Sequence, residues 1–294
     1  MKNIAITGGA GFIGSHLVKK LLEKKYRAIV IDNLSTGSES NIHKKALFKK
    51  IDIRDFGALK QAMNGIDSVF HLAALPRIQR SIQSPLETNE VNVQGTLNVL
   101  EAARVNKVKR VIFTSSSSVY GDQKSLSLTE NMIPQPLSPY ALQKLMGEKY
   151  CQMYTDLYGL ETLSLRLFSV YGPGQNGRDE FATVIGRFLY LKNRGKPLII
   201  YGDGEKTRDF THINDVVEAL IRSMEIKLPK KRIINICAGK THSINQIAKL
   251  IGGRVVYKEK RKGESQRIQG SNELAKKILK WEPQTSLKEG IKMC

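Results

Sequence analysis

Short apolar runs alternate with longer amphipathic segments from residue 1 to about residue 170. Apolar runs that are rich in β-branched residues and bounded by turn residues predict strands, and their alternation with helices is typical of βαβ units and a parallel sheet. We predict strands at Asn3–Thr7, Arg27–Asp32, Leu47–Ile51, Ser68–Leu72, Arg110–Thr114 and Thr162–Phe168. The pattern therefore indicates a doubly wound α/β fold with a parallel sheet.

Three amphipathic helices are predicted between these strands. In the first, apolar residues recur at three- and four-residue spacing, so that one face of the helix is directed at the sheet. That face carries Phe12, Ile13, Leu17, Val18 and Leu21. Two longer helices are predicted over Glu87–Val105 and Tyr140–Tyr158.

The pattern changes after residue 170, where Tyr171–Gly177 has the residues of a loop and the later elements are shorter. We predict a first domain over residues 1–170, to which a return segment at about 208–238 also belongs. This segment carries a helix over Ile213–Met224 and a strand over Arg232–Ile236. Residues 171–207 and 239–294 are predicted to form a smaller α/β lobe.

Composition and charge narrow the class of protein. With 41% hydrophobic and 25% charged residues, the chain resembles an ordinary globular protein. The net charge of +20 is compatible with a nucleic-acid site, but the lysine pairs are spread along predicted helices, which favours a solvated surface. No signal peptide or apolar run of membrane-spanning length is evident, and the three cysteines lie far apart. We expect a cytoplasmic protein without a metal, membrane or nucleic-acid partner.

A glycine-rich loop follows the first strand, with the sequence Thr7-Gly8-Gly9-Ala10-Gly11-Phe12-Ile13-Gly14. The glycines at positions 8, 11 and 14 permit a tight turn, a close backbone approach to a ligand and close packing of the helix. A glycine triplet alone is a weak signal, but its place between a strand and an amphipathic helix is typical of a Rossmann dinucleotide site. The pyrophosphate is then expected at the N-terminus of the helix.

Asp32 closes the second strand about 20 residues after this loop, where a carboxylate can bind both hydroxyls of an adenosine ribose. An Asp at a strand end is by default only a turn former, but the glycine loop favours the ribose role. The negative charge favours NAD over NADP. Asp52, after the third strand, is a weaker candidate for a position near the adenine.

Tyr140 and Lys144 stand one helical turn apart, so both side chains can reach one hydroxyl. An ammonium and a positive nicotinamide would each lower the pKa of the phenol from about 10, as a general base requires. Tyr120 and Lys124 have the same spacing, but Tyr120 precedes a turn, whereas Tyr140 follows Pro139 at a helix start. We therefore assign catalysis to Tyr140. The serine run after Thr114 can supply a hydroxyl at the same sheet edge.

These motifs together resemble the extended short-chain dehydrogenase/reductase family, most closely the UDP-sugar 4-epimerases of the UDP-glucose 4-epimerase type. The resemblance covers nearly the whole chain. It rests on the glycine loop and on His71-Leu72-Ala73-Ala74, Thr114 to Ser118 with Val119-Tyr120-Gly121, Tyr140-Ala141-Leu142-Gln143-Lys144, Leu165 to Pro173, Tyr201 to Phe210 and Arg261-Lys262-Gly263-Glu264.

The resemblance implies an NAD-dependent epimerase that interconverts UDP-glucose and UDP-galactose through a 4-keto sugar, with N-acetylated or uronic sugars as further possible substrates. Tyr140 would take the proton of the 4-hydroxyl, assisted by Ser116, while hydride passes from C4 to NAD and returns on the other face. Lys144 would also hold the nicotinamide ribose. The implied cofactor-binding residues are Gly8, Gly11, Phe12, Ile13, Gly14, Asp32, Asn33, Asp52, Ile53, Leu72, Ala73, Ala74, Asn92, Tyr140 and Lys144.

On the substrate side, the resemblance places Arg208 and Arg261 on the UDP diphosphate, Tyr201 on uracil and Glu264 on the uridine ribose. The implied substrate-binding residues are Ser116, Ser169, Tyr201, Arg208, Arg261 and Glu264. Ser169 departs from the usual Asn, and Ile268 stands where a bulky Tyr often limits the sugar pocket, which would admit N-acetylated sugars. The family also implies a homodimer in which Glu87–Val105 and Tyr140–Tyr158 form a four-helix bundle.

Two other readings remain open. A dehydratase, decarboxylase or 4-keto reductase of nucleotide sugars would share the fold, but dehydratases and decarboxylases usually carry an acidic residue before Val-Tyr-Gly, where this chain has Ser117 and Ser118. A non-catalytic NAD- or RNA-binding relative would have no physical need for Tyr140, Lys144 and Ser116 together. Epimerisation is therefore preferred.

Overall fold

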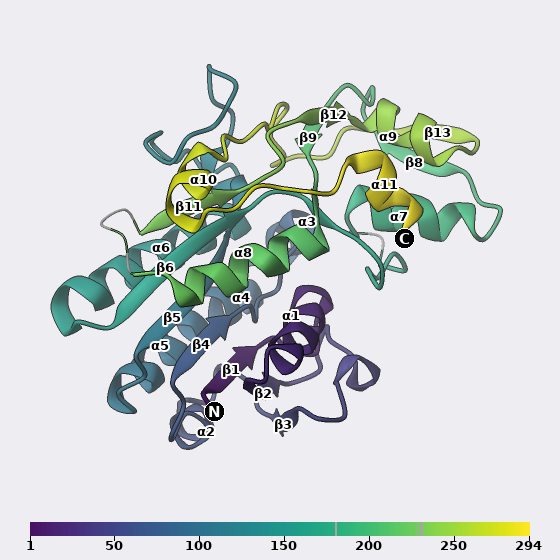
Figure 1. The fold of residues 1–294 in the computed structure, drawn as a ribbon. Helices are drawn as coiled ribbons and strands as arrows, with labels where there is room; N and C mark the ends of the chain where they lie inside the picture. Colours follow the sequence, from purple (N-terminus) through teal and green to yellow (C-terminus); the bar gives the residue numbers. More distant parts are fainter. Residues whose placement is uncertain (180, 228, 230–231) are drawn as a thin grey trace.

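A seven-stranded parallel sheet forms the centre of the molecule (Figure 1). The computed structural model describes residues 1–179, 181–227, 229 and 232–294, and all statements here refer to these residues; positions 228, 230 and 231 of the predicted return segment lie outside them. The strand order is β11-β6-β5-β4-β1-β2-β3. The strands are β1 (Asn3–Thr7), β2 (Arg27–Asp32), β3 (Leu47–Lys50), β4 (Ser68–His71), β5 (Arg110–Ser116), β6 (Glu161–Leu167) and β11 (Ile233–Ile236). The predicted doubly wound α/β fold is confirmed.

Helices cover both faces of the sheet, because successive strand residues point to opposite sides. On β1, Ile4 and Ile6 pack in one hydrophobic cluster and Ala5 packs in the other. The first cluster is covered by α1 (Phe12–Glu23), α8 (Ile213–Glu225) and α10 (Glu273–Leu279). The second is covered by α2 (Phe56–Ala62), α5 (Gly95–Val105) and α6 (Pro139–Tyr158).

Two predicted elements differ from the structure by more than one residue. The helix predicted over Glu87–Val105 begins at Pro85 and contains a π-helical turn, so that it consists of α4 (Pro85–Asn89), η2 (Glu90–Gln94) and α5 in direct succession. The serine run continues β5 to Ser116 and then enters the 3₁₀ helix η3 (Ser117–Tyr120). Local spacing does not reveal a π turn, which occurs mostly as a single wide turn at a functional site.

The remaining elements surround the carboxyl ends of the central strands or form a separate layer at the upper right of Figure 1. A third hydrophobic cluster, which includes Phe188, Leu198 and Ile247, holds that layer together. The elements are η1 (Glu39–Asn41), α3 (Ile78–Gln83), β7 (Val170–Tyr171), α7 (Val184–Lys192), β8 (Leu198–Tyr201), β9 (Thr207–Asp209), β10 (Thr211–His212), β12 (Thr241–Ser243), α9 (Ile244–Ile251), β13 (Val255–Lys258) and α11 (Leu287–Lys292). Three strand pairs, β7 with β10, β8 with β13 and β9 with β12, lie outside the main sheet.

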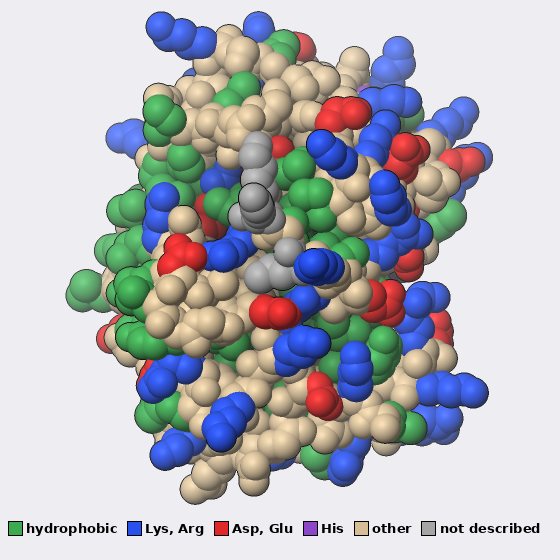
Figure 2. Space-filling view, turned by 60° about the vertical axis from the view of Figure 1, so that its left-hand side comes forward, with side chains coloured by type: hydrophobic (Ala, Val, Ile, Leu, Met, Phe, Trp, Pro, Cys, Tyr) green, Lys and Arg blue, Asp and Glu red, His purple; other side chains and the backbone are tan. Residues whose placement is uncertain are grey.

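The strand order reverses between β1 and β4, which lie next to each other in the sheet. Ligands of open α/β sheets bind at such a switch point, beyond the carboxyl ends of the strands. On the face shown in Figure 2, Lys and Arg side chains are dispersed and interspersed with acidic ones, with no single basic patch. No helix within the described residues is long and apolar enough to cross a membrane.

Candidate active site

The glycine loop leaves no room for side chains at two of its positions. Gly8 has a φ of +71°, and a Cβ there would lie 2.7 Å from the Ala73 nitrogen. At Gly14, a Cβ would lie only 2.2 Å from the Gly8 carbonyl oxygen. Helix α1 begins after Gly11, and no side chain among the described residues caps its N-terminus. Its first N–H groups and its dipole are therefore available to a phosphate.

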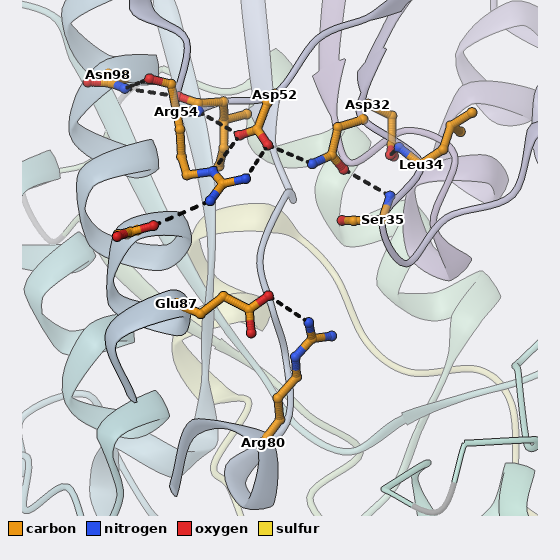
Figure 3. Close-up of polar contacts among 11 residues, drawn as sticks. Asp32, Leu34, Ser35, Asp52, Arg54, Arg80, Glu87 and Asn98 are labelled. Carbon is orange, nitrogen blue, oxygen red and sulfur yellow. Dashed lines mark hydrogen bonds and ion pairs between the residues drawn. The ribbon is translucent and has the colours of Figure 1, made fainter. Parts of the chain in front are cut away.

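The carboxylate of Asp32 is anchored to this loop. Oδ2 accepts a hydrogen bond from the Ala10 N–H at 3.0 Å. Oδ1 accepts one from the N–H of Leu34, which Figure 3 labels beside Asp32, at 2.8 Å. Asp32 is 8% exposed. Each oxygen retains a further lone pair, so the carboxylate can both form the turn and accept two ribose hydroxyls.

The carboxylate of Asp52, which follows β3, is held by the guanidinium of Arg54 (Figure 3). Arg54 donates from Nε at 3.0 Å and from Nη2 at 2.7 Å, and its hydrogen bonds are the main reason why the pKa of Asp52 falls to about 2. Asn33 donates its amide to Asp52 at 2.8 Å, and Arg54 also contacts Glu90 at 3.3 Å. Asn33 and Asp52, two of the predicted cofactor residues, are thus directly joined.

His71 orders a chain of hydrogen bonds beneath the switch point. The Thr96 hydroxyl donates to the Asn92 carbonyl at 2.7 Å, so it accepts from His71 Nε2 at 2.9 Å. His71 Nδ1 then accepts from the Thr7 hydroxyl at 2.7 Å, and Thr7 accepts from the Ala73 N–H at 3.3 Å. Burial, and then the charge of Lys144, lowers the pKa of His71 to about 3, so the ring is neutral.

Asn92 fixes the loop that follows Leu72-Ala73-Ala74. It lies in the π turn η2, accepts from the Leu75 N–H at 2.8 Å and donates to the Leu75 carbonyl at 3.2 Å. Its amide also donates to Gln143 on α6 at 2.8 Å. Nearby, Ile53 is buried against Gly95, where a Cβ would lie 2.5 Å from the Ile53 Cδ1. Asn92 therefore links the predicted cofactor loop to the helix that carries Tyr140.

Tyr140, Lys144 and Ser116 meet at the carboxyl end of β5. The Ser116 oxygen accepts from the Ser118 N–H at 3.2 Å and from its hydroxyl at 2.9 Å, so its own proton is available to donate. The Lys144 ammonium is 4% exposed and donates to the Thr114 carbonyl at 2.8 Å. The structure thus gathers the three residues to which the sequence assigned catalysis.

The cation that lowers the pKa of Tyr140 is Arg77, whereas the sequence predicted Lys144. Burial raises the pKa of the phenol above 10, while its hydrogen bond with Ser116 and the charge of Arg77 lower it. Lys144 is not among these influences, and burial lowers the pKa of its own ammonium to about 8. The expected acidification of Tyr140 by Lys144 is therefore not seen in the protein alone.

A buried ion pair fixes α6 against the sheet. Glu148, one turn after Lys144, accepts from Arg166 Nη2 at 2.7 Å and from the Ser115 hydroxyl at 2.5 Å, and both charged side chains are at most 2% exposed. The Arg166 guanidinium lies 4.5 Å from the centroid of the Tyr120 ring, and the Tyr120 hydroxyl donates to Asn235 at 2.7 Å. Tyr120 is fully buried, in agreement with its structural assignment.

On the substrate side, Glu264 is surrounded by donors. It accepts from the Lys206 ammonium at 2.9 Å and from the Gln79 amide at 3.4 Å, and Arg208 Nη2 lies 4.0 Å away. Lys206 is 6% exposed. Arg208 and Glu264, both predicted substrate residues, thus lie together, and two cations face one carboxylate. Lys206 and Arg208 can therefore offer positive charge to an anionic ligand.

The other predicted substrate residues are arranged differently. The Arg261 guanidinium lies 3.6 Å from the centroid of the Tyr201 ring, so it covers one face of the ring expected to stack on uracil. Ser169 follows β6, and its carbonyl accepts from the Thr211 N–H at 3.4 Å. Ile268 is 3% exposed in a hydrophobic cluster with Phe168, Tyr120 and other side chains, so it is part of the packed interior.

Sequence reasoning missed several residues of the site. Gln79 and Ser81 belong to α3, a helix of six residues that is too short for a periodic signal, and Arg77 is the N-cap residue before it. Lys206 directly precedes Thr207-Arg208 in the motif Tyr201 to Phe210, but the motif does not assign it a role. His71 stood within a quoted motif too, and its place at the end of a buried strand was the available signal.

The residues present fit a dinucleotide, since the space that a Cβ would fill at Gly8 and Gly14 lies beside an uncapped helix N-terminus and the Asp32 carboxylate. The family model for the NAD-dependent epimerase/dehydratase family matches residues 4–237. The chain belongs to this family, and its cofactor is NAD.

Individual relatives span different sugars and reactions. The crystal structure of UDP-glucose 4-epimerase with UDP-glucose from Thermotoga maritima is 38% identical, covers 99% of this chain and 96% of its own, and superposes with a TM-score of 0.95. A UDP-glucuronate 4-epimerase of Thermodesulfobacterium geofontis is 35% identical over 98% of this chain and 93% of its own. A UDP-N-acetyl-alpha-D-glucosaminuronate decarboxylase of Bacillus cytotoxicus is 37% identical over 84% and 78%. Because identity is similar for all three, it does not decide the substrate.

Proposed function

We propose that the protein is a UDP-sugar 4-epimerase that interconverts UDP-glucose and UDP-galactose. The observation that carries the proposal is the meeting of Tyr140, Ser116 and Lys144 at the carboxyl end of β5, on the same edge of the sheet as the dinucleotide loop. A phenol, a hydroxyl and an ammonium at one point can deprotonate and reprotonate a sugar hydroxyl. The proposed domain roles follow: residues 1–170 with 208–238 hold NAD, and residues 171–207 and 239–294 hold the nucleotide sugar.

In this proposal Tyr140 accepts the proton of the 4-hydroxyl as C4 becomes a ketone. Bound NAD supplies the chemistry of accepting a hydride and returning it. Ser116, whose proton is available, donates to the same sugar oxygen and holds it against the phenol. When the ketone is reduced on its other face, Tyr140 returns the proton. The proton balance therefore closes on one residue.

Lys144 has a binding role in this proposed cycle. Its buried ammonium donates to the Thr114 carbonyl, which fixes the side chain one turn away from Tyr140. With the pKa of the ammonium lowered to about 8, Lys144 remains mainly protonated at neutral pH. It can thus hold the nicotinamide ribose, while Ser116 and Arg77 stabilise the phenolate that forms during turnover.

The substrate end of the proposal rests on charge. Arg208 is largely buried, and its charge is offset by Glu264 and Asp122, so a diphosphate at this place would gain a charge-assisted contact. Glu264 is proposed to bind the uridine ribose, and Tyr201 with Arg261 to cover the base. Ser169 would contact the phosphates.

The test is to incubate purified protein with individual UDP-hexoses and follow the anomeric proton signals by NMR. Conversion between UDP-glucose and UDP-galactose without added NADH is the expected result. A panel with UDP-N-acetylhexosamines and UDP-uronic acids determines the sugar preference. Bound NAD without interconversion of any pair would reject epimerisation.

The same panel separates other reactions of nucleotide sugars. A 4-keto-6-deoxy product would identify a dehydratase, release of carbon dioxide a decarboxylase, and stoichiometric consumption of NADH a reductase. A non-catalytic relative would show no product and no difference between the wild type and Tyr140→Phe.

We also propose a homodimer through α5 and α6. On α6, Leu142, Met153 and Leu157 are 49%, 39% and 66% exposed, and Val105 at the end of α5 is 37% exposed. Exposed apolar side chains on adjacent helices favour a helical interface. Light scattering after size-exclusion chromatography should give twice the monomer mass, and Leu157→Glu should give the monomer.

A cytoplasmic location is also part of the proposal. The three cysteines are unpaired, which suits a reducing cytoplasm.

A further inference from the structure

Helix α3 contacts both halves of the site, although it contains only six residues. At one point Gln79 donates its side-chain amide to the Lys262 carbonyl at 2.9 Å and to Glu264 at 3.4 Å. Two residues further on, Ser81 accepts a hydrogen bond from the Tyr140 N–H at 3.0 Å. The helix thus connects the segment that carries Glu264 with the first turn of α6.

The contact between Ser81 and Tyr140 is specific. Tyr140 follows Pro139 in the first turn of α6, where an N–H group has no acceptor within the helix. Ser81 is fully buried, its hydroxyl donates to the Ile78 carbonyl at 2.7 Å, and its oxygen is left to accept from Tyr140. Displacement of α3 would therefore leave a backbone donor of the catalytic residue unsatisfied.

The contact between α3 and the segment 261–264 is also close. Gly263 has a φ of +75°, and a Cβ there would lie 3.0 Å from the Ile82 Cδ1 and 3.5 Å from the Leu137 carbonyl oxygen. The segment 261–264 is thus packed against α3 and against the residues just before α6. A movement of this segment would therefore act on α3 at two points, at Gln79 through its hydrogen bonds with Lys262 and Glu264 and at Ile82 through its packing against Gly263.

We propose that Gln79 is a positioning residue through which occupation of the nucleotide subsite holds Tyr140 in place. The inference rests on the proposed function, because it takes Glu264 as the ribose ligand. A nucleotide bound to Glu264 fixes segment 261–264 against Gln79, α3 is fixed in turn, and Ser81 holds the first turn of α6. Binding energy from the nucleotide, which does not react, is thereby used to orient the reacting group.

The test is amide hydrogen exchange of the NAD-loaded protein with and without UDP, followed in peptides that contain Tyr140. In the wild type, UDP is expected to slow exchange of the Tyr140 amide about tenfold, a common size for coupling between two sites. Gln79→Leu keeps a side chain of similar length but removes both hydrogen bonds, and the UDP effect should vanish. Gln83→Leu is the matched control, an exposed glutamine on the same helix, and should retain it.

Turnover supplies a second readout. With the hexose that proves to be the substrate, Gln79→Leu should lower kcat about tenfold and change KM less than threefold, as expected for loss of orientation rather than of binding. UDP binding that leaves the Tyr140 amide of the wild type unchanged overturns this inference alone, as does a variant in which only KM changes. Failure of the wild type to bind UDP overturns the proposed function as well.

Discussion

The cofactor side of the site and the side proposed to bind the nucleotide sugar are built by different means. Around NAD, the structure relies on backbone N–H groups and on glycines without room for a Cβ, and most of these lie within residues 7–14. On the sugar side, the groups are long charged or polar side chains from residues 206–208, α3 and the segment 261–264, which are far apart in the chain. The cofactor side is therefore defined by shape, and the proposed nucleotide-sugar side is defined by charge.

This difference predicts different sensitivities. A site defined by shape tolerates almost no added volume, because its neighbours are backbone atoms that cannot move independently. A site defined by charge tolerates changes of volume better than loss of a partner, because an unpaired buried charge is costly. Lys206 and Arg208 both face Glu264, so removal of any one of them alters the balance for the other two.

Tyr140→Phe tests the point where the two halves meet and should have the largest effect. Loss of the phenolic oxygen removes the general base, so kcat should fall about 10²–10⁴-fold while NAD remains bound. The initial rate of UDP-hexose interconversion and the NAD content after purification are the two measurements. Turnover within tenfold of the wild type would show that another group moves the proton.

Gly14→Ala tests the half defined by shape. The added methyl would lie 2.2 Å from the Gly8 carbonyl, and strain of about 1–3 kcal/mol taken from cofactor binding weakens NAD affinity up to about a hundredfold. Gly57→Ala on α2, where the nearest atom is 3.5 Å away, is the matched control and should bind NAD normally. Titration of the released and rebound cofactor measures both; equal affinities would contradict the role of shape.

The contrast also explains which parts of the site could be predicted. The glycine loop, Asp32 and the Tyr140–Lys144 pair are local patterns, in which spacing alone determines relative position. The pairing of Lys206 with Glu264 spans 58 residues, and no periodicity in the chain reports it. The π turn at Asn92 and the short helix α3 escaped for the same reason, because each is fixed by tertiary contacts and not by its own sequence. The family resemblance indicated Glu264, but it did not indicate Lys206 and Gln79, which donate hydrogen bonds to its carboxylate.

Lys206→Met tests the half defined by charge. It leaves Glu264 with a weaker set of donors, and a hydrogen bond between charged groups is worth about 1.5–3 kcal/mol. The expected result is a KM for the UDP-sugar raised about ten- to a hundredfold, with NAD binding unchanged. Lys206→Arg keeps the charge and should recover most of the affinity. Equal losses in both variants would show that the shape of Lys206 matters more than its charge.

His71 should have the smallest effect on turnover, and it gives the cofactor side of the site a pH-dependent stability. Its pKa of about 3 in the folded protein lies below the ordinary 6.5, so between these values the unfolded chain binds the additional proton. The free energy of unfolding should therefore fall as the pH drops from about 6.5 towards 3, by up to about 1.4 kcal/mol per pH unit from this group.

Urea unfolding of the wild type at pH 7, 6 and 5 should show this slope. His71→Gln should be less stable at pH 7, because the chain from Thr7 to Thr96 is broken, but its stability should change less with pH. His43→Gln, at a histidine that contacts only its own turn among the described hydrogen bonds, is the control and should keep the slope of the wild type. An unchanged slope in His71→Gln would mean that other groups control the acid sensitivity. The ordered hydrogen bonds beneath Ala73 would then serve to place the NAD loop without making it sensitive to acid.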